Sequence, residues 1–287
     1  MEIRKIEDKC IKCMLCVKDC IAGVIRNIDG EAQIVQPDLC NLCSHCVAVC
    51  PKGAIYHDGL DAKDLREIKK ELISSESYKE IAITRRSIRN YKDKSVPKEI
   101  IEDIIDIARY SPTASNLQDV GYTIVTDKHL LKKVSNWIFG LGNWVYSLLQ
   151  TTPGKTFKWA LEQAEATKSA AKYFDGMDYY KQQSELGKDY ILHNAPVLIL
   201  IHSPSGMEFA SDNCNISAAN ITNYAHSLGL GTCYIGFLTL ALRYDPILKW
   251  WLDIPKDRQV YSSLVMGYPS YSHAFTVCRK KAFVKWI

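Results

Sequence analysis

Between positions 10 and 20 the sequence reads Cys10-Ile11-Lys12-Cys13-Met14-Leu15-Cys16-Val17-Lys18-Asp19-Cys20. The same spacing returns thirty residues later, as Cys40-Asn41-Leu42-Cys43-Ser44-His45-Cys46-Val47-Ala48-Val49-Cys50-Pro51. The two runs form an internal repeat, and they hold eight of the eleven cysteines. This pair of runs decides the fold of the first part of the chain.

The spacing points to iron–sulfur chemistry, and the runs resemble the bacterial ferredoxin-like domain with two [4Fe–4S] clusters. Three thiolates at two-residue intervals can wrap around one face of a cubane, while the fourth points away from it. In that family the fourth cysteine ligates the other cluster. The resemblance therefore implies a first cluster held by Cys10, Cys13, Cys16 and Cys50. It implies a second cluster held by Cys40, Cys43, Cys46 and Cys20.

Two other interpretations of the cysteines fit less well. A zinc site with four cysteines usually uses two separated C-x2-C pairs rather than a run of three. A disulfide scaffold needs an oxidising compartment. The spacing therefore favours iron–sulfur clusters over zinc, and zinc over disulfides.

The composition limits the class of protein. The chain has 287 residues, 47% of them hydrophobic, which is enough for a sizeable core in one or two domains. The net charge of +4 is mild, and the basic residues lack the aromatic interleaving of an RNA-binding sheet, so we expect no nucleic-acid partner. The charged start has no apolar leader, and no apolar run approaches the ~20 residues of a membrane span. We expect a cytoplasmic protein, and the clusters suggest anaerobic life.

The rest of the pattern predicts an α+β chain in three parts. These are a cluster domain over 1–58, a polar linker over 59–77 and a second domain over 78–287. In the first, 24–35 indicates a hairpin that turns at Asp29-Gly30, and 55–56 a short closing strand. In the second, we expect helices over 78–84, 97–109, 212–228 and 246–252, two or three helices within 137–190, and strands over 122–126, 196–201 and 261–266.

Three segments of the second domain carry groups that can bind a ligand. Arg85-Arg86-Ser87-Ile88-Arg89 places three arginines and a hydroxyl at a helix end, where they can grip a phosphate by bidentate, charge-assisted bonds. Ser111-Pro112-Thr113-Ala114-Ser115-Asn116 is a polar turn after an amphipathic helix. The glycines of 229–236 can bring backbone N–H groups close to a flat ring. Taken singly, each segment also fits an ordinary structural role: a solvated basic helix end, a helix stop or a turn before a strand.

Taken together, in this order and spacing, the segments resemble the nitroreductase family of flavoproteins over about residues 78–287. Two further matches are the strand that begins at Pro196, and Gly267-Tyr268-Pro269 followed by a basic tail. The resemblance implies an FMN-binding α/β/α domain and a homodimer with intertwined domains and the flavin at the subunit interface. With the cluster domain in front, the whole chain is similar to a ferredoxin-fused nitroreductase.

The same resemblance assigns residues to the flavin. The phosphate and ring-edge motif is matched by Arg85, Arg86, Ser87 and Arg89, and the C-terminal phosphate contact by Arg279 and Lys280. The segment that the partner subunit lays along the flavin is matched by Pro112, Thr113, Ala114, Asn116 and Gln118. The backbone facing flavin N5 is matched by Tyr234, Ile235 and Gly236. Asp119-Val120 stands where many members have Pro-Trp, which alters the wall of the pocket.

A few reactive residues remain outside these motifs. Cys214, Cys233 and Cys278 are expected to be buried or indifferent thiols. His193, just before the apolar strand, can donate a proton near the flavin ring. A histidine at such a position is more often structural, so it is a weak catalytic candidate.

These features predict an enzyme in which one-electron clusters feed a two-electron flavin. The flavin then reduces a small, electron-poor acceptor by hydride transfer from N5: a nitroaromatic, a quinone or an activated alkene. No Gly-x-Gly-x-x-Gly follows a strand, so we expect an external low-potential donor such as ferredoxin. The alternatives are a non-catalytic electron carrier between partner proteins, a reductive dehalogenase and a zinc-stabilised binding module.

Overall fold

The computed structural model describes residues 1–163 and 173–287. The chain divides into two compact units, Met1–Ser74 with Thr113–Gln118 and Ser75–Pro112 with Asp119–Ile287. Separate clusters of buried apolar side chains form the cores of the two units. The predicted limits at residues 58 and 77 stay predictions. Among the described residues, no helix is both long enough and apolar enough to cross a membrane.

The first unit is built from a repeated small motif. Its elements are β1 (Ile3–Lys5), α1 (Leu15–Asp19), β2 (Ile25–Ile28), β3 (Glu31–Ile34), α2 (His45–Ala48) and β4 (Ile55–His57). Each run of cysteines contains one short helix, α1 or α2. β2 pairs antiparallel with β3, and β1 pairs antiparallel with β4. In the predicted linker over 59–77, the helical parts are two 3-10 turns, Ala62–Asp64 and Lys70–Leu72, and the first residues of the helix that begins at Ser75.

The hairpin predicted over 24–35 is confirmed. Its turn residues Asp29 and Gly30 have φ values of 51° and 80°, the left-handed conformation that a two-residue hairpin turn requires. The closing strand at 55–56 is also confirmed, as β4. Its partner β1 was not predicted, because three residues among charged neighbours give no clear periodicity.

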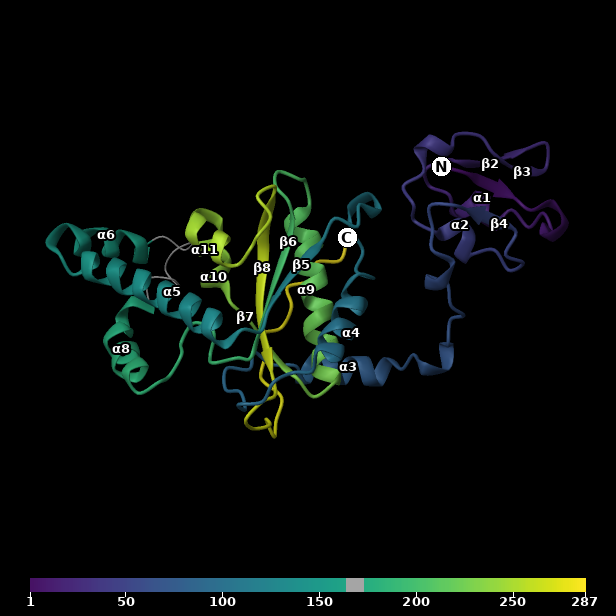
Figure 1. Cartoon of the computed structure of the whole chain (residues 1–287). Helices are drawn as coiled ribbons and strands as arrows, with labels where there is room; N and C mark the ends of the chain where they lie inside the picture. Colours follow the sequence, from purple (N-terminus) through teal and green to yellow (C-terminus); the bar gives the residue numbers. More distant parts are fainter. Residues whose placement is uncertain (164–172) are drawn as a thin grey trace. The chain divides into compact units, whose positions relative to one another are not determined.

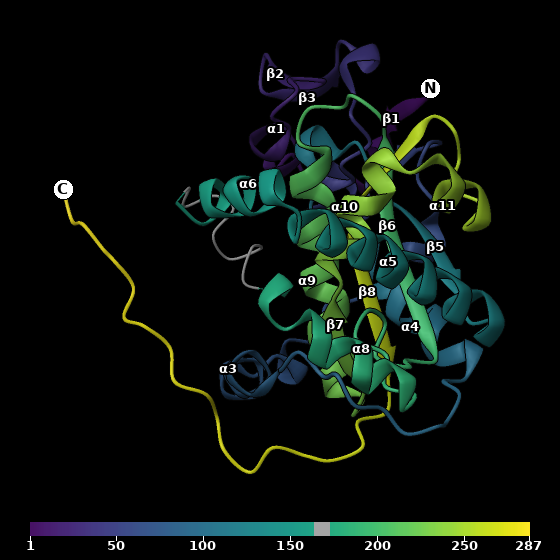
Figure 2. The same ribbon diagram turned by 90° about the vertical axis from the view of Figure 1, so that its left-hand side faces the viewer.

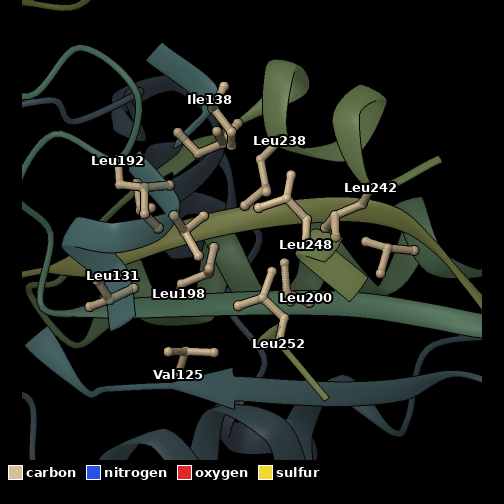
Figure 3. Close-up of a cluster of buried hydrophobic side chains, with 14 of the residues drawn as sticks. Val125, Leu131, Ile138, Leu192, Leu198, Leu200, Leu238, Leu242, Leu248 and Leu252 are labelled. Carbon is tan, nitrogen blue, oxygen red and sulfur yellow. The ribbon is translucent and has the colours of Figure 1, made fainter. Parts of the chain in front are cut away.

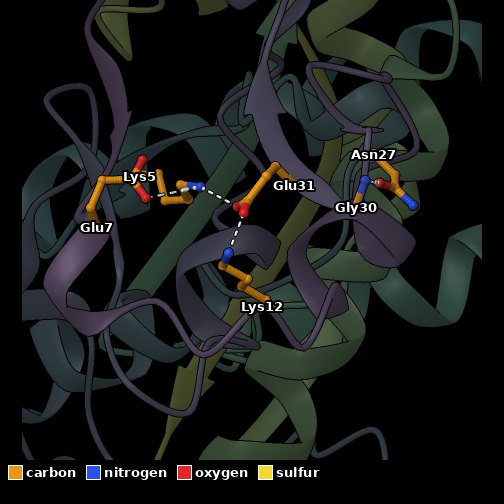
Figure 4. A network of polar contacts seen from close by, with 6 residues as sticks. All are labelled: Lys5, Glu7, Lys12, Asn27, Gly30 and Glu31. Carbon is orange, nitrogen blue, oxygen red and sulfur yellow. Dashed lines mark hydrogen bonds and ion pairs between the residues drawn. The ribbon is translucent and has the colours of Figure 1, made fainter.

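Glu31 of this hairpin forms ion pairs with Lys5 of β1 and with Lys12 of the first cysteine run. The side chain of Lys5 is 9% exposed, and its Nζ lies 3.1 Å from both Glu31 Oε2 and Glu7 Oε2. Glu31, at the start of β3, also pairs with Lys12 between the first two cysteines (Figure 4). The paired lysines hold the pKa of Glu31 below its ordinary value, chiefly through the hydrogen bond from Lys12.

The second unit is an α/β/α layer structure (Figure 1). Its helices are α3 (Ser75–Thr84), α4 (Lys98–Ala108), α5 (Lys128–Leu149), α6 (Thr152–Gln163), α8 (Met177–Glu185), α9 (Ala210–Ser227), α10 (Gly236–Tyr244) and α11 (Pro246–Trp251). Its strands are β5 (Gly121–Val125), β6 (Val197–Pro204), β7 (Gly231–Tyr234) and β8 (Arg258–Gly267). Within the described residues, these strands form one antiparallel sheet in the order β5-β6-β8-β7. The predicted α+β class is confirmed.

β6 shows why the strand at 196–201 is apolar throughout. Alternate side chains of a strand point to opposite faces. Leu198 and Leu200 pack with α5, α10 and α11 on one face (Figure 3). Val197, Ile199 and Ile201 pack with α4 and α9 on the other. Both faces of β6 are therefore covered, and polar alternation is excluded there.

Several predicted bounds change. The helix expected from Tyr78 begins at Ser75, and the strand expected from Tyr261 begins at Arg258. α10 was not predicted. The helices expected within 137–190 include α6, α8 and the second half of α5, while residues 164–172 of that prediction lie outside the described residues. The stop after α9 is confirmed: Gly229 has φ 75°, and Leu230 N donates to Ala225 O at 2.9 Å.

Candidate functional site

Four cysteines from the two runs meet around one small cavity in the first unit. The cavity is lined by Cys10, Cys13, Cys16 and Cys50, with apolar neighbours that include Ile11, Leu15 and Ile55. Burial raises the pKa of the Cys16 thiol, and the charges of Cys50 and Cys10 raise it further. The structure thus brings together the ligand set predicted for the first cluster, with the fourth cysteine supplied by the second run.

The charges of the other four cysteines also act across the two runs, since Cys20 of the first run affects Cys46 of the second. Burial raises the pKa of Cys46 to about 11, and the charges of Cys20, Cys40 and Cys43 add to the shift. Every cysteine of the chain lies in the described residues and is free. Two sets of four reduced thiols fit two cubanes, each of which takes four thiolates. Among the described residues, no group of three or more His, Cys, Asp or Glu is placed to hold a single metal ion.

The basic motif after α3 is fixed against strand β7. Ile88 N donates to Thr232 O at 2.9 Å, and Ser87 forms a parallel bridge with Thr232. A Cβ on Gly231 would stand 2.5 Å from Cγ1 of Ile88, so glycine is required for this approach. Tyr91 Oη donates to Ile88 O at 2.6 Å. The motif therefore has one defined position beside the strand that leads to Gly236.

Arg86 holds an unpaired donor in this motif. Its Nη1 donates to Ile83 O at 2.7 Å and to Arg85 O at 2.6 Å. Its Nε is buried and has no hydrogen-bond partner among the residues that the structure describes. An unmade hydrogen bond of a buried charged group costs about 1–3 kcal/mol or more. A phosphate oxygen is the kind of acceptor that would satisfy it.

A cavity of about 290 Å³ lies where β7 ends and α10 begins. Its lining includes the predicted residues Tyr234, Ile235 and Gly236, together with Asn215, Thr239 and Arg243. The side chain of Ile235 belongs to the core, so its backbone is the part that can face the cavity. Apart from its chain neighbours and the backbone of its own helix, no atom of the described residues lies within 4 Å of the place where a Cβ on Gly236 would stand. A flat ring can therefore approach this backbone closely.

Of the segment predicted to serve the partner's flavin, Thr113–Gln118 belongs to the first compact unit and Pro112 to the second. Ser115, Asn116 and Gln118 have φ values of 50°, 55° and 49°, which is an unusual run of left-handed conformations for residues other than glycine. Gln118 N donates to Thr113 Oγ1 at 2.9 Å. The structure describes a single chain, and the role of Pro112, Thr113, Ala114, Asn116 and Gln118 at a flavin stays a prediction.

His193 and the C-terminal basic pair are placed differently. His193 is half-buried with φ 59°, and burial lowers its pKa, an effect to which nearby Arg89 adds against the opposing charge of Asp189. Its charge therefore interacts with that of Arg89 in the predicted ring-edge motif. Arg279 and Lys280 are exposed on the tail that leaves the body after β8 (Figure 2). Their phosphate contact stays a prediction.

A buried polar network around Asp119 was missed by sequence reasoning. The carboxylate of Asp119 accepts hydrogen bonds from Ser203 Oγ and, at 3.1 Å, from Asn213 Nδ2. Its backbone carbonyl accepts from Arg258, whose Nε donates to Nδ1 of His202 at 2.7 Å. The network fixes the chain immediately after Gln118. The only sequence signal was the departure from Pro-Trp at this position.

We expect Asp119→Ala to destabilise the second unit by about 2 kcal/mol, because it removes the acceptor of the buried Ser203 hydroxyl and a hydrogen bond from Asn213. Denaturant unfolding followed by far-UV circular dichroism measures this. Asp106→Ala is the matched control, since Asp106 pairs with Arg109 on the exposed face of α4 and should cost less than about 0.5 kcal/mol. Equal losses in both variants would contradict a structural role for the network.

The network also predicts a pH dependence of stability. Burial, then the charge of Arg258, lowers the pKa of His202 to about 4, from an ordinary value near 6.5. In the unfolded chain His202 becomes protonated below about pH 6.5, whereas in the folded chain it becomes protonated only near pH 4. Stability should therefore fall across this window, by up to about 3 kcal/mol. In His202→Gln this part of the loss should vanish, and an unchanged pH profile of unfolding would contradict the assignment.

Both parts of the chain are similar to known protein families. A model of the Nitroreductase family matches residues 82–268, and a model described as a 4Fe-4S dicluster domain matches residues 9–55. An iodotyrosine deiodinase of Nematostella vectensis is 30% identical over 75% of this chain and 74% of its own. A 4-nitrobenzoate reductase of Nocardioides sp. is 25% identical over 69% and 83%. The crystal structure of a nitroreductase with bound FMN from Bacteroides fragilis covers 73% of this chain and 97% of its own, with 20% identity and a TM-score of 0.54.

Proposed function

Because this chain belongs to the nitroreductase family and carries a 4Fe-4S dicluster domain N-terminal to the part that matches that family, we propose that it is an FMN-dependent oxidoreductase that receives electrons through two [4Fe–4S] clusters. One observation carries the proposal. The same chain combines two sets of four free cysteines with a basic motif whose buried Arg86 Nε lacks an acceptor. The first suits one-electron carriers, and the second suits a flavin phosphate.

Bound FMN supplies the step that joins one-electron donors to a two-electron acceptor. The chain's own residues position it. Arg86, with Arg85 and Arg89 nearby, would bind the phosphate and neutralise its charge. The backbone of Ile235 and Gly236, which lines the cavity, would face the ring, because residue 236 has no side chain to intervene. His193, whose pKa is lowered by burial, would be available to carry a proton.

The acceptor that fits is a small, flat, electron-poor molecule such as a nitroaromatic, a quinone or an activated alkene. The similarity to a 4-nitrobenzoate reductase supports the first of these. The donor is an external low-potential carrier such as ferredoxin. The active form is a homodimer with FMN at the subunit interface, to which Pro112–Gln118 of the partner chain contributes.

Iron, acid-labile sulfide and released flavin, measured on anaerobically purified protein, test the cofactors. We expect about eight iron, about eight sulfide and about one FMN per chain. Photoreduction of the clusters should then bleach the flavin absorbance, and a nitroaromatic should reoxidise it with saturable kinetics. FMN that stays oxidised while the clusters are reduced would contradict the proposal. Rapid turnover with the nitroaromatic would exclude the alternative of a non-catalytic electron carrier.

Reductive dehalogenation is the second candidate, favoured by the 30% identity to an iodotyrosine deiodinase. It uses the same cofactors and differs in the acceptor. A direct competition between a nitroaromatic and a halogenated tyrosine, at equal concentration and with the same reduced protein, separates the two. Halide release at a rate above nitro reduction would favour dehalogenation.

A further inference from the structure

His57 places its ring next to a cysteine of the second run. The residue lies at the end of β4 and is only 6% exposed. Its Nε2 is 3.3 Å from Sγ of Cys40. Its Nδ1 accepts a hydrogen bond from the backbone N of Gly59 at 3.1 Å. Pairing with Ile3 in β1 fixes its backbone, and both ring nitrogens have a contact.

The bond from Gly59 decides which ring nitrogen carries the proton. A neutral imidazole has one N–H and one lone pair, and here the lone pair is on Nδ1. The proton is therefore on Nε2, and it points to Cys40 Sγ. A Cβ on Gly59 would stand 2.8 Å from Cδ2 of Leu42 and 3.1 Å from Cε1 of His57. Glycine is thus what allows the backbone donor to come this close.

The repeat supplies an internal comparison for this contact. Thirty residues before His57, the equivalent position is Asn27. Its side chain is exposed and accepts from Gly30 N at 3.0 Å in the hairpin turn (Figure 4). A sulfur of the first cysteine set receives a backbone donor instead, from Ala54 N to Cys50 Sγ at 3.2 Å. The first half of the repeat therefore has no side-chain counterpart of His57 at this position.

We propose that His57 raises the reduction potential of the second [4Fe–4S] cluster by donating a hydrogen bond to Cys40. The proposal rests on the proposed function, in which Cys40 is a cluster ligand. One-electron reduction makes the cluster and its cysteine sulfurs more negative. A donor to one of these sulfurs stabilises the reduced form more than the oxidised form, so the potential rises. His57 is a positioning and tuning residue, and it does not touch a substrate.

The test is an EPR-monitored redox titration of the full-length, cluster-loaded protein. His57→Phe keeps an aromatic ring but removes the donor. We expect the redox equilibrium of one cluster to shift about tenfold toward the oxidised form. For a one-electron couple this lowers the reduction potential by about 59 mV. The other cluster should be unchanged. His57→Gln keeps an N–H near the Nε2 position and should restore most of the potential. Asn27→Ala, at the equivalent position, should leave both potentials as they were.

Two results of this titration would overturn the proposal. One is His57→Phe protein with full iron and both potentials unchanged. The other is an equal shift of both clusters, which would come from a general change of the fold. Failure of the proposed function is visible separately, as missing iron, sulfide or flavin before any titration.

A second measurement applies if His57→Phe does not assemble its clusters. Long-range proton–nitrogen NMR of histidine-labelled protein reports the tautomer of His57 directly. His45→Gln removes the other histidine of the first unit from the spectrum. A proton on Nε2 is expected, and a proton on Nδ1 would overturn the proposal.

Discussion

Replacing Cys20 with serine is expected to lower the iron content from about eight atoms per chain to about four. Cys20 ends the first run in sequence, yet its charge acts on the Cys46 thiol of the second run. The variant should therefore lose the second cluster and keep the one whose four cysteines line the cavity of the first unit. Iron and sulfide analysis of anaerobically purified protein measures the loss.

Two double variants decide whether the fourth cysteines cross over. Cys20→Ser with Cys46→Ser removes two ligands of the same cluster, so about four iron atoms should remain. Cys20→Ser with Cys16→Ser removes one ligand from each cluster, and the iron content should fall to near zero. The opposite result, with iron kept only in the second pair, would mean that each run ligates its own cluster.

Replacing Arg86 with leucine is expected to weaken FMN binding about 30- to 100-fold, which is roughly 2–3 kcal/mol for a hydrogen bond to a charged group. The variant removes the one buried donor of the motif that has no partner in the structure. Quenching of FMN fluorescence on titration into flavin-free protein measures the dissociation constant. The iron content should be unchanged, because Arg86 belongs to the second unit.

Two further variants control this prediction. Arg86→Lys keeps the charge but loses the planar fork, so its affinity should lie between those of the wild type and Arg86→Leu. Arg109→Leu removes an exposed arginine at the C-terminal cap of α4 and should leave FMN binding unchanged. Because Arg86 also bonds two carbonyls at the end of α3, circular dichroism must show that the fold survives. Unchanged affinity in folded Arg86→Leu would remove Arg86 from the site.

The features that the sequence predicts well depend on local chemistry. Asp29-Gly30 predicts its hairpin because two adjacent residues in left-handed conformation favour this turn type. The apolar run at Val197–Ile201 predicts a strand buried on both faces because no alternation survives there. The motif also predicts a flavin-facing backbone at Ile235-Gly236; a cavity lies beside it, and the role at a flavin stays a prediction.

Some features that the sequence does not predict depend on contacts between distant segments, and others on glycines within helices. Asp119, His202 and Arg258 come from separate segments, and nothing in their spacing reveals that they meet. α10 begins at Gly236, a poor helix former, so its start looks like a loop. The helix α5 contains Gly140 and Gly142, which interrupt the helical pattern although the helix runs on through both.

The central position of β6 has a consequence for how the second unit opens. Leu198, Ile199 and Leu200 are fully buried, and β6 lies between β5 and β8. Amides in such a strand exchange their hydrogens with solvent only when the whole unit unfolds, whereas the edge strands β5 and β7 can also exchange by local fraying. Hydrogen exchange at β6 therefore reports the global free energy of unfolding of the second unit.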